Sequence, residues 1–381
     1  MGPSRRGAGV LAIAAAIGIA RRDEGDGAAV QSVSDVGQLV RAHRVAERAL
    51  VWLGSRVRSN GSIEMTRAQY QPTLAASALA ALAFMANGHT ADEGADGHGA
   101  RVRAIVSWLV SQPAIDDCAC SLVKGAHQVA KFADAEHTTS DMHGHGYVTW
   151  ALAMACGMSF GAENVHQRSE LVRIAQAAVH CIELAQHSTG GWFYSLTAGG
   201  NDHEGSVTVT ALQALRSAKE AGLRVDARVI EKAVSYLQQS QVKSPDDPKL
   251  GAFRYRLGEP LTSFALTAAA VSSLNQAGDY DSRYVDLGIE FMRQKDPLAH
   301  AFAEPERWPW YGRFYATQAY WQYRELRHFR NWYPALVDAS EHEQDERDGR
   351  FTDDEFGDVY ATAMAALTLG VPFGYLPSFE R

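Results

Sequence analysis

Two kinds of apolar segment alternate along the chain. In the first kind, apolar residues recur at helical spacing, so Val229, Ala233 and Leu237 share one face of a predicted helix while Glu231 lies on the other. In the second kind, such as residues 261–274, no charged residue occurs. A helix with one apolar face lies at a surface, whereas a helix that is apolar all round is buried on every side. The chain therefore predicts helices in two different environments.

This pair of helices recurs about every 55 to 70 residues, as expected for stacked helical repeats. Most of the second helices stop at a glycine such as Gly278, which is a helix C-terminal signal. No alternating strand pattern of useful length appears. Six hairpins are expected, at residues 45–57 with 70–87, 102–111 with 146–156, 171–186 with 205–221, 228–238 with 261–274, 283–295 with 311–325, and 329–343 with 358–369.

The alternation predicts an all-α fold of twelve helices in an inner and an outer concentric layer, a single α/α toroid. In an open stack, the second helix of each hairpin would be exposed on one face, and closing the ring buries that face around a narrow axial cavity. The alternative is an open superhelix of the tetratricopeptide or HEAT type, whose units are shorter, about 34 to 47 residues. The longer repeat favours the closed ring.

Composition supports a large folded core and excludes one class of partner. Of the 381 residues, 46% are hydrophobic and 21% are charged, which excludes global disorder. The formal net charge is -8 and no long basic stretch occurs, so we expect no nucleic-acid partner. The four cysteines, Cys118, Cys120, Cys156 and Cys181, do not make a disulfide framework in so long a chain.

The N-terminal segment differs from the rest of the chain. Arg5 and Arg6 precede an apolar run over residues 7–20, which suits a signal peptide and is too short to span a bilayer. The expected division is a signal-peptide-like or disordered segment at 1–25, a linker or first helix at 26–44, and the toroid at 45–381. The expected location is the periplasm or cell envelope, with the cytoplasm as the alternative. No transmembrane span is expected in the mature chain, and the sequence leaves the oligomeric state open.

Residues 186–192 carry a resemblance to a known family. Gln186, Gly190 and Trp192 read Q-x-x-x-G-x-W, which resembles the QW repeat of squalene-hopene and oxidosqualene cyclases, shared in looser form with protein prenyltransferase β-subunits. Gln241 with Gly251-Ala252-Phe253 is a weaker copy. The resemblance implies an α/α toroid over about residues 45–381, in which Gly makes a tight turn and Gln and Trp tie one hairpin to the next. It says little about the reaction.

A narrower resemblance rests on three further segments, Asp141–Tyr147, Gly205–Val209 with Ala214–Ser217, and Pro372–Pro377. They are similar to a group of exported bacterial prenyltransferase/squalene oxidase repeat proteins. This resemblance implies a fold and a compartment, and it carries no reaction.

The catalytic motifs of these families are mostly missing. Class II cyclases protonate an alkene with a D-x-D-D acid, and no D-x-D-D occurs here, so we predict that the protein does not cyclise squalene. Protein prenyltransferases hold zinc with Asp, Cys and a later His. Asp116-Asp117-Cys118 matches D-x-C, but it lies in the connection of the second hairpin, so a solvated loop is expected.

The predicted ring brings the starts of the inner helices together at one end of the axis. Their unpaired N–H groups and positive dipole ends favour anions or polar ligands. The candidate ligand-binding residues at these starts are Tyr70, His143, His145, Tyr147, Tyr311, Arg313, Tyr315 and Tyr360. The catalytic candidates are Asp202, His203 and Asp358, and the candidate metal ligands are His143, His145 and His203, with zinc as the expected metal.

Structural roles compete with these assignments. Asp202 and Asp358 stand where helix N-caps stand, and the aromatic residues could serve packing alone. We expect Asp358 beside Tyr70, because the sixth hairpin must pack on the first.

Three classes of function remain open. The first is an enzyme or binder for a hydrophobic, isoprenoid-like molecule in the central cavity, and the second is an exported binding or scaffold protein without catalysis. The third is a toroid of the polysaccharide-lyase kind, which needs a basic residue beside an acidic sugar in a groove. A deep apolar pocket, a filled axis or an open polar cleft would distinguish these classes.

Overall fold

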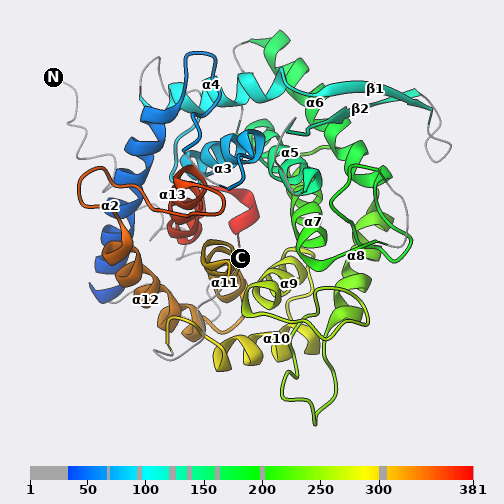
Figure 1. The fold of residues 1–381 in the computed structure, drawn as a ribbon, viewed down its shortest axis with the longest axis vertical. Helices are drawn as coiled ribbons and strands as arrows, with labels where there is room; N and C mark the ends of the chain where they lie inside the picture. The colour runs from blue at the N-terminus through cyan, green and yellow to red at the C-terminus, as the bar shows by residue number, and fades with distance from the viewer. Residues whose placement is uncertain are drawn as a thin grey trace.

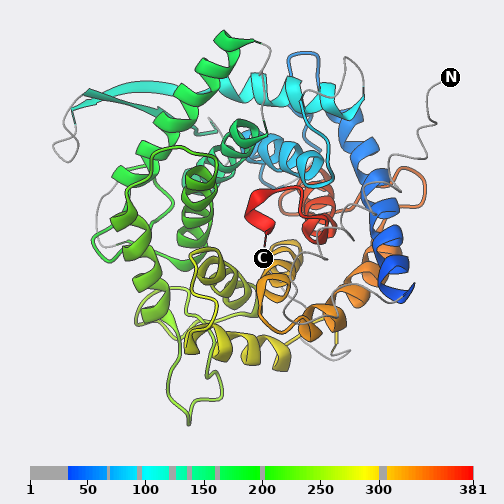
Figure 2. The same ribbon diagram turned by 180° about the vertical axis from the view of Figure 1, so that it is seen from behind.

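The computed structural model describes residues 33–66, 69–91, 97–119, 126–134, 140–158, 164–197, 202–299 and 307–380. Within these ranges, twelve α-helices form two concentric rings, as Figures 1 and 2 show. The outer helices are α2 (Val33–Arg56), α4 (His98–Val110), α6 (Val165–Leu184), α8 (Ala227–Ser240), α10 (Arg283–Gln294) and α12 (Arg327–Glu343). The inner helices are α3 (Thr73–Ala86), α5 (Asp141–Gly157), α7 (Gly205–Glu220), α9 (Phe264–Gln276), α11 (Pro309–Gln322) and α13 (Asp358–Leu369). The predicted all-α toroid is confirmed.

Burial follows the two sequence patterns. Every residue of α9 is buried, as its uncharged sequence predicts. In α10, by contrast, burial is confined to one face that includes Val285, Ile289 and Met292. The inner helices are therefore covered on all sides, and the outer helices shield them from solvent.

The ring closes between the last and the first hairpin. Helix α13 packs on α3 and α2, and α12 packs on α2. Arg41 of α2 forms salt bridges with Asp338 (2.7 Å) and Glu341 (2.5 Å) of α12. The backbone N–H of Tyr70 donates to the carbonyl oxygen of Glu355 at 2.9 Å. These contacts exclude the open superhelix.

A glycine turn is repeated where an outer helix gives way to the next inner helix. Gly190, Gly251 and Gly349 have φ angles of 96°, 88° and 85°. A Cβ atom at Gly190 or Gly251 would lie 2.2 or 2.1 Å from a carbonyl oxygen of the following outer helix. Only glycine fits, because both the backbone conformation and the close approach exclude a side chain.

Glutamine side chains tie these turns to the neighbouring hairpin. The amide of Gln186 donates to the carbonyls of Gly190 (3.0 Å) and Val229 (2.8 Å), the latter on α8. Gln241 bonds Gly251 and α10 in the same way, and Gln344 bonds Gly349 and α2. The third copy closes the ring. It escaped the sequence analysis because the Gln-to-Gly spacing differs between the copies.

One hairpin of strands lies outside the helical pattern. Strands β1 (Ala114–Ala119) and β2 (Ala126–Lys131) pair antiparallel in the connection from α4 to α5, and they project from the ring in Figure 1. The prediction of no strand is therefore wrong here. Neither segment alternates β-branched or aromatic residues with polar ones, so sequence periodicity gave no signal.

The C-terminal segment fills the axis at the end where the inner helices stop. After η1 (Val371–Phe373), the chain turns inward to η2 (Pro377–Phe379), near the centre of Figures 1 and 2. Phe379 is fully buried between the rings of Trp150 and Phe314, with centroid distances of 6.3 Å to each. The indole N–H of Trp321 donates to the carbonyl of Phe379 at 2.9 Å. One end of the axis is therefore closed.

In the described part of the chain, no helix has the length and apolar character needed to cross a bilayer. The predicted signal-peptide-like segment at 1–25 and residues 26–32 of the next segment lie outside the described residues, whereas residues 33–44 belong to α2.

Candidate functional site

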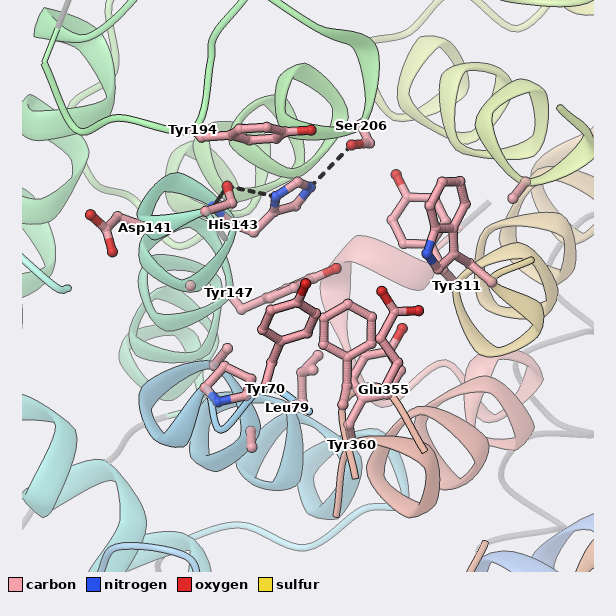
Figure 3. Close-up of a pocket in the computed structure, with 18 of the residues that line it drawn as sticks. Tyr70, Leu79, Asp141, His143, Tyr147, Tyr194, Ser206, Tyr311, Glu355 and Tyr360 are labelled. Carbon is pink, nitrogen blue, oxygen red and sulfur yellow. Dashed lines mark hydrogen bonds between the residues drawn. The ribbon is translucent and has the colours of Figure 1, made fainter. Parts of the chain in front are cut away.

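A cavity of about 420 Å³ opens at the other end of the axis, where the inner helices begin. Figure 3 shows the cavity with residues that line it, Tyr147 and Tyr360 among them. All six inner helices contribute residues at or near their starts: Pro72 and Leu74, Ser140 and His143, Ser206, Ser263 and Leu266, Trp308 and Tyr311, and Tyr360. Parallel inner helices therefore place their N-terminal ends around one mouth.

Aromatic side chains form much of the wall. They are Tyr70, Phe132, Tyr147, Tyr194, Tyr255, Trp308, Tyr311, Phe356 and Tyr360. Phe356 connects two of them, with ring centroids 5.6 Å from Tyr70 and 5.2 Å from Tyr360. Leu74, Leu79 and Leu266 add aliphatic surface. The cavity is therefore mainly apolar, with polar groups at fixed places.

Three of the tyrosine hydroxyls are neutral, those of Tyr147, Tyr311 and Tyr360. Burial raises the pKa of Tyr147 to about 12, and it raises the pKa values of Tyr311 and Tyr360 well above the ordinary value. The hydroxyl of Tyr311 is buried and has no hydrogen-bond partner. A buried hydroxyl without a partner costs free energy.

A hydrogen-bonded chain runs along one wall through His143. Its Nδ1 is 2.8 Å from Ser140 Oγ and its Nε2 is 3.2 Å from Ser206 Oγ, contacts drawn in Figure 3. Ser206 Oγ in turn donates to Glu204 at 2.8 Å. Burial lowers the pKa of His143 to about 4, so the imidazole is neutral at physiological pH. One ring nitrogen is then a donor and the other an acceptor.

Glu204 ends this chain and caps α7. Its carboxylate accepts hydrogen bonds from the backbone N–H groups of Ser206 (2.9 Å) and Val207 (2.7 Å). The side chain is fully buried. Burial raises its pKa to about 7, although the capping hydrogen bonds oppose that shift. Glu204 therefore exchanges a proton near neutral pH, and Ser206 and His143 connect it to the cavity.

Three further carboxyl groups line the cavity, at Asp134, Asp141 and Glu355. Burial raises the pKa of Asp134 to about 6, although its carboxylate accepts a hydrogen bond from the N–H of Leu74 at 3.1 Å. In Figure 3, the carboxylate of Glu355 points into the cavity near Tyr311, whereas Asp141 lies at the edge and points away. Asp134 and Glu355 are therefore two acidic groups that line a largely apolar space.

Five of the predicted ligand-binding residues line the cavity: Tyr70, His143, Tyr147, Tyr311 and Tyr360. His145 does not. Its Nδ1 accepts from the N–H of Phe132 (3.3 Å) and its Nε2 bonds the carbonyl of Ala178 on α6 (3.0 Å). Residues 143 and 147 are one helical turn apart and share a face, and residue 145 lies on the opposite face toward the outer layer.

Arg313 and Tyr315 also lie away from the cavity surface. Arg313 turns toward the outer ring, where it forms a salt bridge with Glu343 of α12 at 2.5 Å. Tyr315 is fully buried one turn below Tyr311 and packs against it with centroids 4.6 Å apart. Neither residue lines the cavity, and both instead pack within the protein around it.

The three catalytic candidates are not brought together. Asp202 is exposed, and His203 Nδ1 bonds the hydroxyl of Tyr236 on α8 at 2.9 Å. Asp358 lies near Arg350 (3.5 Å), and its N–H donates to Thr66 beside the first hairpin. The last hairpin does meet Tyr70 there, but through Glu355 and Phe356. None of the three predicted catalytic residues lines the cavity.

The metal candidates likewise have separate partners. The ring nitrogens of His143, His145 and His203 engage Ser206, Ala178 and Tyr236 respectively, so they do not converge on one ion. The side chain of Cys118 in the D-x-C segment lies outside the described residues.

The cavity-lining residues that the sequence analysis missed are mostly in loops. Tyr194 and Tyr255 each stand two residues after the buried aromatic residue of the glycine turn, Trp192 or Phe253. That repeated offset was a usable signal. Asp134 and Glu355 occupy connections whose course is set by tertiary packing, and the sequence offers no comparable signal for them.

No protein-family model matches the sequence, and no curated protein matches it either. Solved structures do match the fold over most of the chain. A sugar epimerase from a ruminal bacterium is 12% identical with a TM-score of 0.57, covering 87% of this chain and 98% of that one. A GH76 α-mannanase from Bacteroides thetaiotaomicron is 10% identical with a TM-score of 0.58, covering 89% and 98%.

An unsaturated glucuronyl hydrolase specific for heparin is also similar, at 10% identity and a TM-score of 0.54, covering 88% of this chain and 97% of that one. All three share the α/α-toroid fold. These matches support the predicted toroid fold. None of the three proteins is a prenyltransferase or a squalene cyclase, so they do not support the resemblance to that family. At these identities, the likeness concerns the fold alone.

Proposed function

We propose that this protein is a carbohydrate-processing enzyme that acts on a sugar bound in the mouth cavity. The observation that carries the proposal is the lining of that cavity, where aromatic faces surround a few fixed polar groups, among them Asp134, His143 and Glu355. A sugar ring presents C–H groups on its faces and hydroxyl groups at its edge. Aromatic rings suit the faces, and carboxylate, imidazole and hydroxyl groups suit the edge.

The solved structures with this fold support the same class of substrate. The three neighbours are by name a sugar epimerase, a mannanase and a glucuronyl hydrolase. A shared fold does not transfer an activity, so the cavity must carry the argument. Its size, about 420 Å³, is in the range of small-molecule sites rather than of an extended polymer groove. We therefore expect a short sugar or a chain end as the substrate.

The reaction best supported is cleavage of a glycosidic bond by two carboxyl groups. Asp134 has a pKa raised to about 6 by burial, so it can carry the proton that the leaving oxygen needs. Glu355, whose carboxylate points into the cavity, would be the base or nucleophile. His143 and Ser206 would hold substrate hydroxyl groups, with Glu204 behind them as a proton reservoir.

A panel of aryl glycosides and short neutral and acidic oligosaccharides tests this proposal. We expect turnover of at least one member, and we expect Asp134→Asn to lose that turnover while its far-UV circular dichroism stays unchanged. Glu231→Gln, an exposed carboxyl group on α8, is the matched control. Turnover that is unchanged in Asp134→Asn would refute this assignment, and absence of any sugar binding or turnover across the panel would refute the class.

A second candidate has its own observation. The aliphatic surface of Leu74, Leu79 and Leu266 also suits an apolar, isoprenoid-like molecule. Quenching of Trp308 fluorescence by farnesol or geranylgeraniol, compared with quenching by the oligosaccharides, separates the two ligands. A Trp308→Phe variant identifies the signal from this residue. Saturable quenching by the isoprenols alone would favour the apolar ligand.

A further inference from the structure

A second cluster of reactive side chains lies away from the mouth cavity. Glu47 is on α2, His89 follows α3, and His98 is the first residue of α4. The three belong to the first and second hairpins, and none lines the cavity. In the described part of the chain, they are the one group of three or more His, Cys, Asp or Glu residues whose ligand atoms all lie within 4.8 Å of one another.

The distances in this cluster match those around a metal ion. His89 Nε2 is 3.2 Å from one carboxylate oxygen of Glu47, and His98 Nε2 is 3.7 Å from the other. A tetrahedral ion with bonds of about 2.0 to 2.1 Å holds its ligand atoms about 3.3 Å apart. These two separations involve different oxygens of Glu47 and lie on both sides of that value. With one ligand atom from each residue, all three atoms lie within 4.8 Å of one another, so side-chain rotations would bring them to the spacing around an ion.

The chemistry of the donors selects the kind of metal. Two imidazole nitrogens with one carboxylate oxygen form a set that zinc uses, with a water molecule in the fourth position. Calcium and magnesium prefer oxygen ligands throughout. A site with two imidazole donors thus favours zinc or a similar transition-metal ion.

The surroundings hold the three side chains in place and leave them reachable. Their side chains are 20% to 34% exposed. The ring of His98 packs on Phe84 at 5.1 Å and on the ring of His89 at 4.6 Å. The three side chains are therefore held close together at a partly exposed site.

We propose that Glu47, His89 and His98 bind one zinc ion, which clamps α2 to the start of α4. The clamp joins positions 47, 89 and 98 of the chain, so it links the outer layer of the first hairpin to that of the second. Zinc that binds the folded chain in preference to the unfolded one raises its stability. This site is independent of the proposed sugar chemistry, and its test needs no substrate.

The test uses tag-free full-length protein that has been stripped with chelator and dialysed. Calorimetric titration with zinc sulfate should show one equivalent bound. Cobalt(II) should give the intense visible absorption of a four-coordinate ion. Zinc should also raise the thermal unfolding midpoint of the stripped protein.

Three variants identify the ligands, and one serves as a control. Glu47→Gln, His89→Ala and His98→Ala should each weaken zinc binding by more than about 100-fold, because loss of a direct ligand costs more than loss of a supporting residue. His166→Ala, at an exposed histidine of α6, should bind as the wild type does. Glu47→Gln keeps the size of the side chain, and circular dichroism reports the fold of every variant.

Two results would overturn the proposal. One is the absence of stoichiometric zinc binding by the wild type, which would leave the cluster as a hydrogen-bonded ion pair only. The other is unchanged zinc affinity and an unchanged cobalt spectrum in the Glu47→Gln/His98→Ala double variant, which would place the ion elsewhere.

Discussion

The two ends of the toroid axis are built from the same six helices and have opposite character. At the end where the inner helices start, acidic side chains meet unpaired N–H groups. Glu204 bonds the first N–H groups of α7, and Asp134 bonds the N–H of Leu74 in α3. At the end where they stop, the side-chain partners are donors. The amide of Asn87 donates to the carbonyls of Ala83 and Ala366.

Helix polarity explains this difference. Parallel inner helices collect positive dipole ends and free N–H groups at one mouth and carbonyl groups at the other. The first mouth favours carboxylates, and burial then raises the pKa values of Asp134 and Glu204 into the range of acid–base chemistry. The second mouth is closed by the C-terminal segment, with Phe379 on the axis. The open end therefore presents acid–base groups to a cavity, and the closed end is filled by packed side chains that stabilise the ring.

The largest expected effect is at the open mouth. Glu355→Gln removes the carboxylate that points into the cavity and keeps its shape. We expect turnover of the best substrate from the glycoside panel to fall by about 10² to 10⁴-fold, equal to about 3 to 5 kcal/mol of barrier. The urea midpoint should stay within error of the wild type. Initial rates are compared with Glu231→Gln, and equal rates would remove Glu355 from the reaction.

At the closed mouth, we expect a substitution to lower the stability of the fold. Phe379→Ala empties a fully buried position between Trp150 and Phe314, so we expect a loss of about 3 to 5 kcal/mol in the free energy of unfolding. Urea denaturation followed by circular dichroism measures it. Val165→Ala, at a side chain 77% exposed on α6, is the control. A change in Phe379→Ala no larger than the control would mean that the segment does not stabilise the ring.

The third prediction concerns pH. The pKa of Glu204 is about 7 in the folded protein against 4.5 for the free side chain. Between these values the folded state binds more protons, so this residue makes stability fall as pH rises, by roughly 3 kcal/mol in total. We expect Glu204→Gln to lack that fall between about pH 4.5 and 7. His143 and His145, with pKa values lowered to about 4, act in the opposite direction.

The measurement is therefore the difference between wild type and Glu204→Gln in unfolding free energy at several pH values. Terms common to both proteins, such as those of His143 and His145, cancel in the difference. A difference that is constant between pH 4.5 and 7 would show that Glu204 titrates near its ordinary pKa.

The sequence predicted the ring well because its signals are local. An uncharged helix such as α9 must be buried, and a one-sided helix such as α10 must lie outside, so both layers followed from periodicity. The strands β1 and β2 gave no alternation and were missed. Closure of the ring could be inferred, but the third glutamine tie, at Gln344, was hidden by its changed spacing.

The site was predicted only in part because a mouth is a tertiary feature. Helical spacing places His143 and Tyr147 on the cavity side and could have excluded His145. Asp134 and Glu355 come from connections, and burial, which only the folded chain shows, is the main cause of the raised pKa of Asp134. Glu47 lies on α2, well before His89 and His98 in the sequence, so no local pattern joins the three residues.

The smallest expected effect separates packing from hydrogen bonding at the closed mouth. The amide of Gln322 donates to the carbonyls of Ser378 and Glu380, both at 3.2 Å, while its own oxygen is buried without a partner. In Gln322→Leu the lost donations are offset by removal of that unpaired oxygen, so we expect a loss of no more than about 1 kcal/mol.

Gln344→Leu is the matched comparison. That amide donates to the carbonyls of Val45 and Gly349 at 2.9 and 2.8 Å across the seam of the ring, so its removal should cost more, about 1 to 3 kcal/mol. Urea midpoints of the two variants decide the order. A larger loss in Gln322→Leu would mean that hydrogen bonds to the terminal carbonyls, rather than the packing of Phe379, hold the C-terminal segment on the axis.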